Sequence, residues 1–341
     1  MNLSFIIPAY NASDTIERTL DSIVCCSIPE SEYEIIIVDD CSTDNTFQLC
    51  KNYSLRHTNI RILQQKENHR QGAARNRGVQ EANGDYIMYV DADDIVMDGV
   101  KEAVNQALAL DVDVLFCNYL WMYSDSNIEH RALPLANGTV MEGCDFTELY
   151  YDMIINTCPI CYLWRRKYLL NTNIWYVEDR QIEDFDYIEK NVYYSRTVGY
   201  SNAIIYKVLT YQNLKSTTHT VSYKTVADWV HVCYRRYLFC DVIKGISPMF
   251  CEKIDGQCRA FVSSSLSFRR CSRFSVVDFK KILRRVGYAE LVYLYEKGGW
   301  SVFNRLCMKH KDIASIIIAI SYPIASIGRS VVSLFRKFLE K

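Results

Sequence analysis

Hydrophobic and polar positions follow two different periods in the first part of the chain. Short, continuous apolar runs rich in β-branched residues are typical of buried strands, and they predict strands at 3–7, 33–38, 60–64, 86–90 and 112–117. Between these runs, apolar residues recur at the spacing of one helix face. This spacing predicts helices from Ser13 or Asp14 onward, at 72–82 and at 98–110. Strands that alternate with helices predict an α/β fold with a doubly wound, mostly parallel sheet.

The pattern changes after the fifth predicted strand. Pro134 and the pair Asn137-Gly138 are turn signals, so residues 118–143 are predicted to be irregular. Further along the chain, the same periods predict a helix at 146–155 and an extended segment at 160–164. From about Thr225 onward the strand signals stop and the pattern is helical. We therefore expect two domains, an α/β domain at 1–220 and a helical, basic region at 221–341.

Carboxylates gather where the predicted strands end. Asp39 and Asp40 follow the second strand, and Asp91, Asp93 and Asp94 follow the strand at 86–90. The carboxyl edge of an open α/β sheet is where ligands bind, so these loops are expected to form one site. Two carboxylates in D-x-D spacing can hold a hard cation, which can take diphosphate oxygens as further ligands. Mg²⁺ or Mn²⁺ with a nucleotide is one interpretation, and a solvated acidic turn or helix cap is the other.

Two glycine-rich fingerprints of phosphate binding are missing from the sequence. No G-x-G-x-x-G follows the first strand, and no G-x-x-x-x-G-K-[ST] occurs in the chain. Both a dinucleotide-dependent oxidoreductase and a P-loop protein are therefore disfavoured. Phosphates must instead be held by a metal and by side chains.

A second acidic cluster occupies Glu178-Asp179 and Glu183-Asp184, and Asp186 follows it. The apolar residues behind it are typical of the start of a packed helix. Carboxylates at a helix start are often caps, because they interact favourably with the helix dipole. The alternative is a general base that takes a proton from a hydroxyl group. The residues alone leave both interpretations open.

The composition is that of an ordinary globular protein, with 49% hydrophobic and 23% charged residues among 341. The chain contains 14 cysteines. Since we expect no signal peptide before the first strand, a reducing cytosol is the expected compartment.

The net charge of −1 hides an asymmetry: residues 267–341 contain 15 Lys and Arg against five Asp and Glu, which makes +10 and leaves −11 for the rest.

This basic end favours an anionic partner. Residues 313–328 carry no charge, but Pro323 interrupts them, and a membrane span needs about 20 apolar residues. We therefore expect an amphipathic helix at an anionic membrane surface, with a helix buried in the protein as the alternative. Nucleic acid is not an expected partner, because no base-reading motif accompanies the charge.

Four blocks of the sequence resemble the family 2 glycosyltransferases, which adopt the GT-A fold, and especially bacterial enzymes that build surface polysaccharides such as capsule or O-antigen. The blocks are residues 4–11, 34–44, 72–94 with the D-x-D, and Glu183-Asp184. They occur in the order of the family and cover residues 1–215. Cys41 departs from the pattern, since the family usually has glycine there.

The resemblance implies a role for each matching residue. The residues implied in nucleotide-sugar binding are Pro8, Ala9, Tyr10, Asp39, Asp40, Arg75 and Asp91. Asp93 would coordinate Mn²⁺ or Mg²⁺ together with Asp91, and His219 is a candidate for a further metal ligand. Asp184 would deprotonate the acceptor hydroxyl, and Glu183 would help to place the acceptor.

The reaction implied by the resemblance is an inverting transfer from a nucleotide-diphosphate sugar, such as a UDP-hexose or UDP-N-acetylhexosamine. The acceptor would be a glycan hydroxyl, on a glycan linked to polyprenyl diphosphate at the cytoplasmic face of the cell membrane. A polyprenyl-phosphate sugar transferase is the alternative among enzymes, because an ionised phosphate needs no base. A nucleotide-sugar-binding module without catalysis is the alternative from another class.

Overall fold

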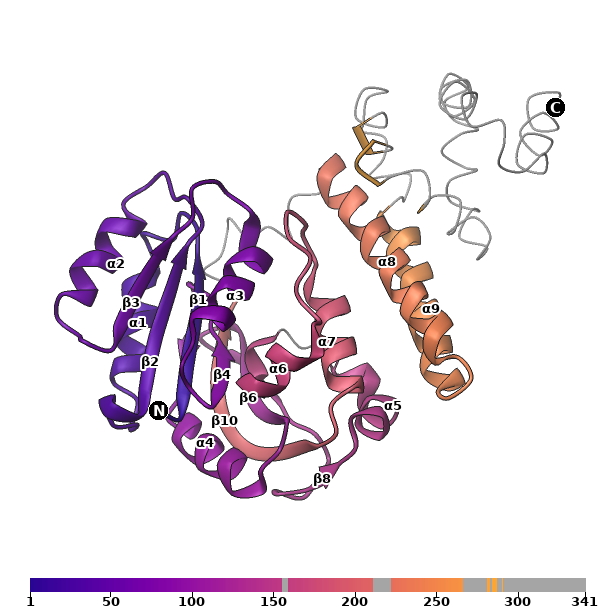
Figure 1. The fold of residues 1–341 in the computed structure, drawn as a ribbon, viewed down its shortest axis with the longest axis horizontal. Helices are drawn as coiled ribbons and strands as arrows, with labels where there is room; N and C mark the ends of the chain where they lie inside the picture. Colours follow the sequence, from indigo (N-terminus) through magenta and orange to yellow (C-terminus); the bar gives the residue numbers. More distant parts are fainter. Residues whose placement is uncertain (155–158, 211–221, 266–280, 283, 287–289, 291–341) are drawn as a thin grey trace. The chain divides into compact units, whose positions relative to one another are not determined.

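The computed structural model describes residues 1–154, 159–210, 222–265, 281, 282, 284–286 and 290. Its contacts divide the chain into two units (Figure 1). One unit contains Met1–Thr217 with Ile243–Phe250, and the other contains Thr218–Val242 with Cys251–Lys341. The predicted domain boundary at 220 stays a prediction, because residues 211–221 lie outside the described part. The uncharged segment 313–328 and His219 lie outside it as well.

A ten-stranded sheet forms the centre of the first unit, in the order β3-β2-β1-β4-β9-β6-β10-β5, with β7 on β6 and β8 on β10. The strands are β1 Leu3–Ala9, β2 Tyr33–Asp39, β3 Ile60–Gln64, β4 Tyr86–Tyr89, β5 Ile95–Val96, β6 Val114–Ser124, β7 Asn127–Arg131, β8 Val140–Met141, β9 Tyr162–Arg165 and β10 Val198–Leu209. The five predicted strands of the first half are all present. Their apolar residues are buried in β1, β2 and β4, whereas β3 and the outer half of β6 are partly exposed.

The long strands of the sheet are mostly parallel, and antiparallel strands make the sheet mixed. β1 is parallel to β2 and β4, and β2 is parallel to β3, as predicted. β9 is antiparallel to both β4 and β6, so the prediction was wrong for this part of the sheet. Two antiparallel steps restore the direction, and β6 and β10 are parallel to each other. The carboxyl ends of β1, β2, β4, β6 and β10 therefore point to the same edge of the sheet.

The helices of the first unit are α1 Ile16–Val24, α2 Thr46–Ser54, α3 Arg70–Glu81, α4 Gly99–Leu110, α5 Gly143–Ile154, α6 Arg166–Thr172 and α7 Asp184–Tyr193. Two short 3₁₀ turns, Glu30–Glu32 and Pro159–Cys161, complete it. The predicted helices are confirmed, although α1 begins later than expected, with Thr15 as its N-cap residue. The cause is a preceding turn, in which Thr15 N–H donates to Ala12 O over 3.0 Å.

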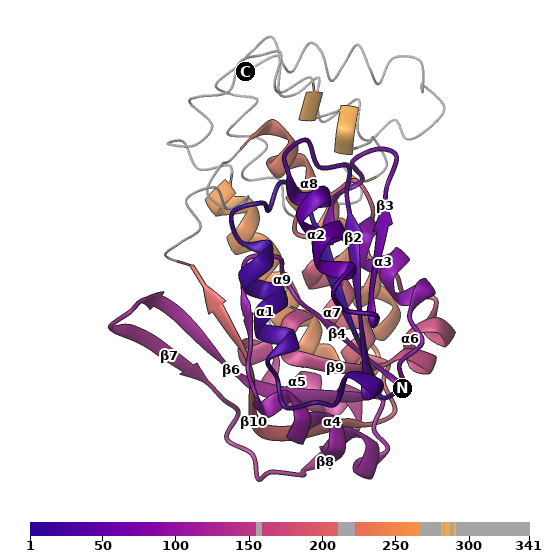
Figure 2. The same ribbon diagram turned by 90° about the vertical axis from the view of Figure 1, so that its left-hand side faces the viewer.

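The prediction that the segment 118–143 is irregular was wrong. Its first half forms a hairpin. β6 continues to Ser124 and pairs with β7, in a ribbon that Figure 2 shows extending from the sheet. The turn signals at Pro134 and Asn137-Gly138 mark only the connection between β7 and β8. The turn residues lie in the second half of the segment, whereas the first half contains aromatic residues, which favour strands.

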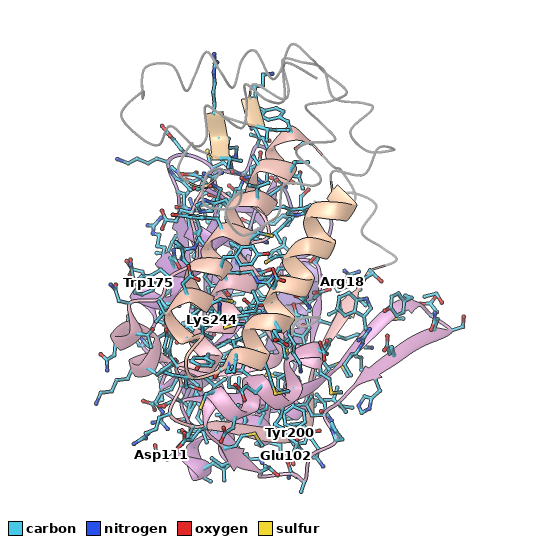
Figure 3. All side chains as sticks on the ribbon, turned by 90° about the vertical axis from the view of Figure 1, so that its right-hand side faces the viewer. Arg18, Glu102, Asp111, Trp175, Tyr200 and Lys244 are labelled. Atoms are coloured by element: carbon cyan, nitrogen blue, oxygen red, sulfur yellow. The ribbon has the colours of Figure 1, made fainter. Side chains whose placement is uncertain are left out.

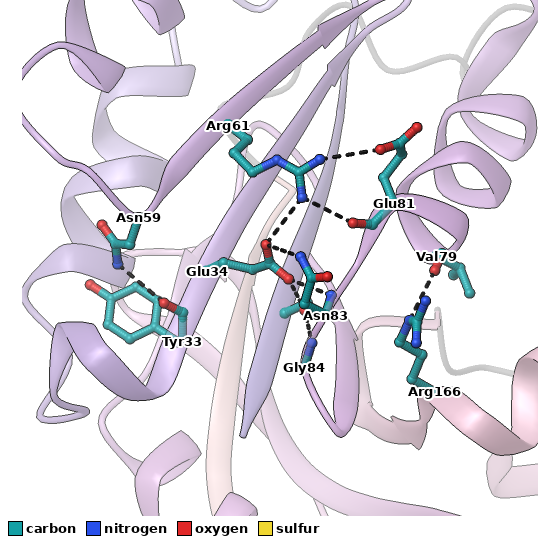
Figure 4. A network of polar contacts seen from close by, with 10 residues as sticks. Tyr33, Glu34, Asn59, Arg61, Val79, Glu81, Asn83, Gly84 and Arg166 are labelled. Atoms are coloured by element: carbon teal, nitrogen blue, oxygen red, sulfur yellow. Dashed lines mark hydrogen bonds and ion pairs between the residues drawn. The ribbon is translucent and has the colours of Figure 1, made fainter. Parts of the chain in front are cut away.

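A polar network closes the sheet at the edge opposite the carboxyl ends (Figure 4). Glu34 on β2 is buried, and its Oε1 accepts from Ser4 Oγ at 2.7 Å and from the Asn83 backbone N–H at 2.6 Å. Arg61 on β3 pairs with the other oxygen at 3.4 Å. Gly84 is required in the same turn, since a Cβ there would lie 2.6 Å from Ser4 N. The network holds the first three strands and the entry to β4 in register.

The second unit contains α8 Tyr223–Ile243 and most of α9 Pro248–Ser265, which confirms the predicted helical character for its described residues. The two helices pack antiparallel, since Cys233 Sγ lies 3.9 Å from Cys258 O and Cys251 Sγ lies 3.6 Å from Cys240 O. Within the part of the chain that the structure describes, no helix combines the length and apolar character needed to cross a bilayer.

Candidate active site

One buried arginine joins the two acidic clusters at the carboxyl edge of the sheet. The Arg75 side chain is 1% exposed, and its Nη2 lies 2.8 Å from Asp91 Oδ1. Its Nη1 lies 2.8 Å from Asp184 Oδ1 and 3.2 Å from Glu183 Oε1. A planar guanidinium can bind several carboxylates at once in fixed directions. Arg75 therefore sets the positions of the D-x-D loop and the start of α7 relative to each other.

Helix α3 can approach the segment 176–183 closely because it carries glycine and asparagine there. A Cβ on Gly72 would lie 2.9 Å from Val177 O, so no larger residue fits without displacement. Asn76 bonds the Tyr176 backbone in both directions, with its Nδ2 donating to Tyr176 O and its Oδ1 accepting from Tyr176 N–H, both at 3.0 Å. These contacts fasten the segment before α7 to α3.

Three tyrosines fill the space behind the ion cluster. Tyr176 stacks on Tyr187 with ring centroids 3.6 Å apart, and the hydroxyls of Tyr89 and Tyr187 are 2.8 Å apart. The Arg75 guanidinium lies over the Tyr176 ring at 5.3 Å. The rings exclude water from one side of the guanidinium, which strengthens its attraction for the carboxylates. No signal in the sequence distinguishes these tyrosines, because aromatic residues at such spacing are typical of any core.

The backbone directly before α7 is strained. Ile182 has a φ of 65° and Asp179 a φ of 60°. A left-handed conformation is unfavourable for a β-branched residue and costs on the order of 1–3 kcal/mol. The strain at Ile182 turns Glu183 and Asp184 toward Arg75 rather than away from it.

The two acids of the pair differ in exposure. Glu183 is fully buried, whereas the Asp184 side chain is 23% exposed. Burial raises the pKa of Glu183 to about 8, and the neighbouring Asp184 carboxylate raises it in the same direction. Burial also raises the pKa of Asp184, while Arg75 opposes the increase. Glu183 occupies the N-cap position of α7 without a capping side-chain hydrogen bond, and Asp184 lies in the first turn of the helix.

The loops after β1 and β2 lie together, as predicted. Ala9 is in register with Asp39, and Asp40 N–H donates to Ala9 O at 2.8 Å. Pro8 precedes Ala9 in β1, and the Tyr10 side chain at its end is 49% exposed.

The two aspartates after β2 have different surroundings. Asp39 is buried, and its Oδ2 accepts from Ser42 N–H and Gln64 Nε2, both at 3.3 Å. Its Oδ1 has no hydrogen-bond partner in the described part of the chain, so it can accept from a ligand. Asp40 Oδ1 accepts from Gln65 Nε2 at 2.7 Å and from His69 N–H at 2.9 Å, which holds the loop before α3.

Cys41 adopts the backbone conformation that favours glycine. Its φ is 63°, in the left-handed region. The loop thus keeps the shape expected with glycine, at a modest conformational cost for a side chain with a Cβ. This departure from the family pattern leaves the neighbouring Asp39 and Asp40 in place.

Three aspartates of the D-x-D loop have separate surroundings. Asp94 is buried, and its Oδ1 accepts from Leu209 N–H at 2.8 Å, so it ties the loop to β10. Asp91 N–H donates to the Tyr206 hydroxyl at 2.9 Å, which gives a second tie to β10. The side chains of Asp91 and Asp93 are partly exposed. Their oxygen donors suit a hard divalent cation.

The described residues include a pair of carboxylates at this loop but no larger group of metal ligands. Among those residues, no three or more His, Cys, Asp and Glu side chains form a group that could hold a metal ion. The pair Asp91 and Asp93 fits a cation that takes its other ligands from a diphosphate.

The sequence matches a known family over its first half. Residues 4–170 match the profile described as Glycosyl transferase family 2. The chain is 29% identical over 222 residues to the uncharacterized glycosyltransferase YibD of Escherichia coli (strain K12), which is 64% of each chain. It is 28% identical over 180 residues to poly(ribitol-phosphate) beta-N-acetylglucosaminyltransferase TarS of Staphylococcus aureus (strain Mu50 / ATCC 700699), which is 52% of this chain and 30% of TarS. The chain thus spans less than two thirds of each of these relatives.

Solved structures show the same fold. The crystal structure of S. aureus TarS 1–349 in complex with UDP-GlcNAc aligns with a TM-score of 0.60 at 19% identity, over 84% of this chain and 79% of that one. The mannosyltransferase PcManGT from Pyrobaculum calidifontis in complex with GDP-Man and Mn²⁺ aligns with a TM-score of 0.53 at 14% identity, over 88% and 85%. At these identities the likeness concerns the fold.

Proposed function

We propose that this chain, whose residues 4–170 belong to glycosyl transferase family 2, is an enzyme of surface polysaccharide synthesis. It would transfer a sugar from a nucleotide-diphosphate sugar to a glycan hydroxyl. The observation that carries the proposal is the contact of Arg75 with both Asp91 and Asp184, each at 2.8 Å. It places the predicted diphosphate-binding loop and the predicted base around one group.

The donor would bind across the ends of β1, β2 and β4. Asp39 Oδ1, which lacks a partner among the described residues, would accept from an N–H of the nucleotide base. Pro8, Ala9 and Tyr10 would line the base and ribose. TarS was solved with UDP and with UDP-GlcNAc, which supports a UDP-sugar as the donor here.

Asp91 and Asp93 would hold Mn²⁺ or Mg²⁺, with His219 as a candidate third protein ligand. Such a cation supplies charge neutralisation for the departing diphosphate. Arg75 binds Oδ1 of Asp91, which leaves Oδ2 as the oxygen that would face the cation. The Mn²⁺ in the complex of PcManGT supports a divalent cation as cofactor.

Asp184 would take the proton of the acceptor hydroxyl. Its partly exposed carboxylate can meet an acceptor, and Arg75 holds it in one orientation. The acceptor oxygen would then form the new glycosidic bond as the bond to the diphosphate breaks, in a single displacement that inverts the anomeric carbon. Glu183 is fully buried, so we assign it to positioning Arg75 rather than, as the resemblance implied, to contact with the acceptor.

The acceptor is proposed to be a lipid-linked glycan at the cytoplasmic face of the membrane. The support is the charge of +10 in residues 267–341, which favours anionic lipid. The full chain should bind vesicles containing phosphatidylglycerol, and a variant that lacks these residues should lose this binding. Unchanged binding would remove the membrane part of the proposal and leave the sugar transfer intact.

A donor hydrolysis screen tests the function. UDP-, GDP- and dTDP-sugars are incubated with the protein, with and without Mn²⁺, alongside Asp93→Ala and Asp184→Asn. The exposed Asp98 supplies matched controls as Asp98→Ala and Asp98→Asn. We expect metal-dependent release of one nucleoside diphosphate. Asp93→Ala should abolish this release, and Asp98→Ala should leave it unchanged.

Two other results would change the proposal. No release from any donor, combined with no metal-dependent nucleotide binding, would refute it. Transfer to a polyprenyl phosphate that survives Asp184→Asn would instead favour a polyprenyl-phosphate sugar transferase, because an ionised phosphate needs no base.

A further inference from the structure

An aromatic row runs along one face of the outer half of β6. Tyr119, Trp121 and Tyr123 alternate along the strand and therefore point to the same face. Adjacent ring centroids are 6.4 Å and 6.3 Å apart. Exposure increases along the row, from 1% at Tyr119 to 42% at Tyr123. The row thus leads from the core to the surface, and Figure 3 draws the side chains of this hairpin as it leaves the sheet.

Charged groups of β7 complete the same face. Arg131 is opposite Tyr119 in the antiparallel pair, and Glu129 is opposite Trp121. The Arg131 guanidinium lies over the Trp121 ring at 5.8 Å and bonds Glu129 at 2.7 Å. The Tyr123 hydroxyl also donates to Glu129, at 3.1 Å. These contacts hold flat rings and hydrogen-bonding groups in one surface.

The buried end of the row, Tyr119, adjoins a buried residue that contacts the candidate active site. Tyr119 is in register with Tyr206 in the parallel pair of β6 and β10, and Val208 is in register with Trp121. Register partners point to the same face of a sheet. The Tyr206 hydroxyl accepts from Asp91 N–H at 2.9 Å. The buried end of the row therefore lies next to the residue that bonds the D-x-D loop, and the row extends over about 13 Å from there to its exposed end.

Trp121 also presents a donor that has not been used. Its Nε1–H has no hydrogen-bond partner within the described ranges. A shielded donor of this kind costs free energy until an acceptor binds it. An oxygen of a bound ligand would satisfy it.

We infer that this face of the β6–β7 hairpin binds a pyranose ring of the acceptor glycan. Pyranose rings have an apolar C–H face, which packs on aromatic rings, and a rim of hydroxyls, which bond carboxylates, guanidinium groups and indole N–H. The exposed part of the row, at Trp121 and Tyr123, combines both kinds of contact. The inference rests on the proposed function, and it adds an acceptor subsite to the donor site.

Saturation-transfer NMR with simple sugars tests this subsite on the full chain. The probes are the methyl glycosides of glucose, galactose, mannose and N-acetylglucosamine, each at saturating UDP. Trp121→Ala and Tyr123→Ala should weaken the binding of a bound glycoside roughly tenfold, whereas Trp121→Phe should retain most of it. Tyr194→Ala removes a tyrosine of similar exposure, 46%, from the C-cap position of α7 and should have no effect.

UDP affinity is measured on every variant and separates the two proposals. Unchanged UDP affinity with lost glycoside binding supports the subsite. The subsite is overturned if UDP affinity is retained and the native chain binds no glycoside. It is also overturned if Trp121→Ala and Tyr123→Ala bind the glycoside as tightly as the native chain does. Both results leave the donor site intact. A hairpin face that instead pairs two copies would appear as a dimer that Tyr123→Ala dissociates, and this also overturns the subsite.

Discussion

The burial of Glu183 leads to a measurable dependence of stability on pH. Burial raises its pKa to about 8 in the folded protein, whereas a glutamate in an unfolded chain has a pKa of about 4.3. Between these values the folded state keeps a proton that the unfolded state has released. The free energy of unfolding therefore decreases as the pH rises through this window, and the loss is complete above about pH 8.

Glu183→Gln removes the ionisation with little change in shape. The amide oxygen can still accept from Arg75 Nη1, which lies 3.2 Å from Oε1 in the native protein. Each pH unit inside the window corresponds to about 1.4 kcal/mol. From about pH 6 to about pH 8, the free energy of unfolding should decrease by about 3 kcal/mol in the native protein but not in the variant. The stability difference between variant and native protein should thus grow with pH and then level off.

Urea unfolding followed by circular dichroism, at several pH values from about 6 to about 9, measures this difference. The control is Glu102→Gln, since Glu102 is exposed on α4 and its removal should leave the pH dependence unchanged. A stability difference between Glu183→Gln and the native protein that stays constant over this range would refute the reasoning. It would mean that Glu183 is already ionised at the lower pH, with Arg75 outweighing burial.

Three further substitutions test other parts of the site. Arg75→Lys should destabilise the protein by about 3 kcal/mol in urea and abolish donor hydrolysis, because one ammonium group cannot bind three carboxyl groups in the directions of a guanidinium; near-native hydrolysis would contradict this. Asp39→Asn should weaken UDP binding roughly tenfold in calorimetry and leave the unfolding midpoint unchanged, because it removes a charged acceptor; equal affinity would exclude Asp39 from the base site. Gly72→Ala should cost about 1–3 kcal/mol in urea and lower the hydrolysis rate, because its Cβ meets Val177 O. Gly256→Ala is its control: nothing lies within 4 Å of the added Cβ, so stability should increase by up to about 1 kcal/mol.

Local patterns in the sequence were sufficient for the first four strands and for the loops that follow them. The apolar runs that became β1, β2 and β4 are buried on both faces, so their sequence carries a strong signal. Carboxylates at strand ends meet at one edge in any parallel sheet, which is why Asp39 and Asp91 were expected together. The same reasoning failed for β9, because strand direction depends on the path of the chain and not on composition.

The sequence by itself determined the strand–helix alternation, the D-x-D loop and the helix that begins at Asp184. Only the tertiary structure decided that Arg75 is buried between Asp91 and Asp184, which are separated from it by 16 and 109 positions. An arginine in a polar helix usually lies at the surface, and no local pattern shows the carboxylates that compensate its burial. The aromatic row of β6 depends equally on pairing with β7 and β10. Contacts between distant segments give these side chains their roles, since burial and charge compensation are properties of the packed chain.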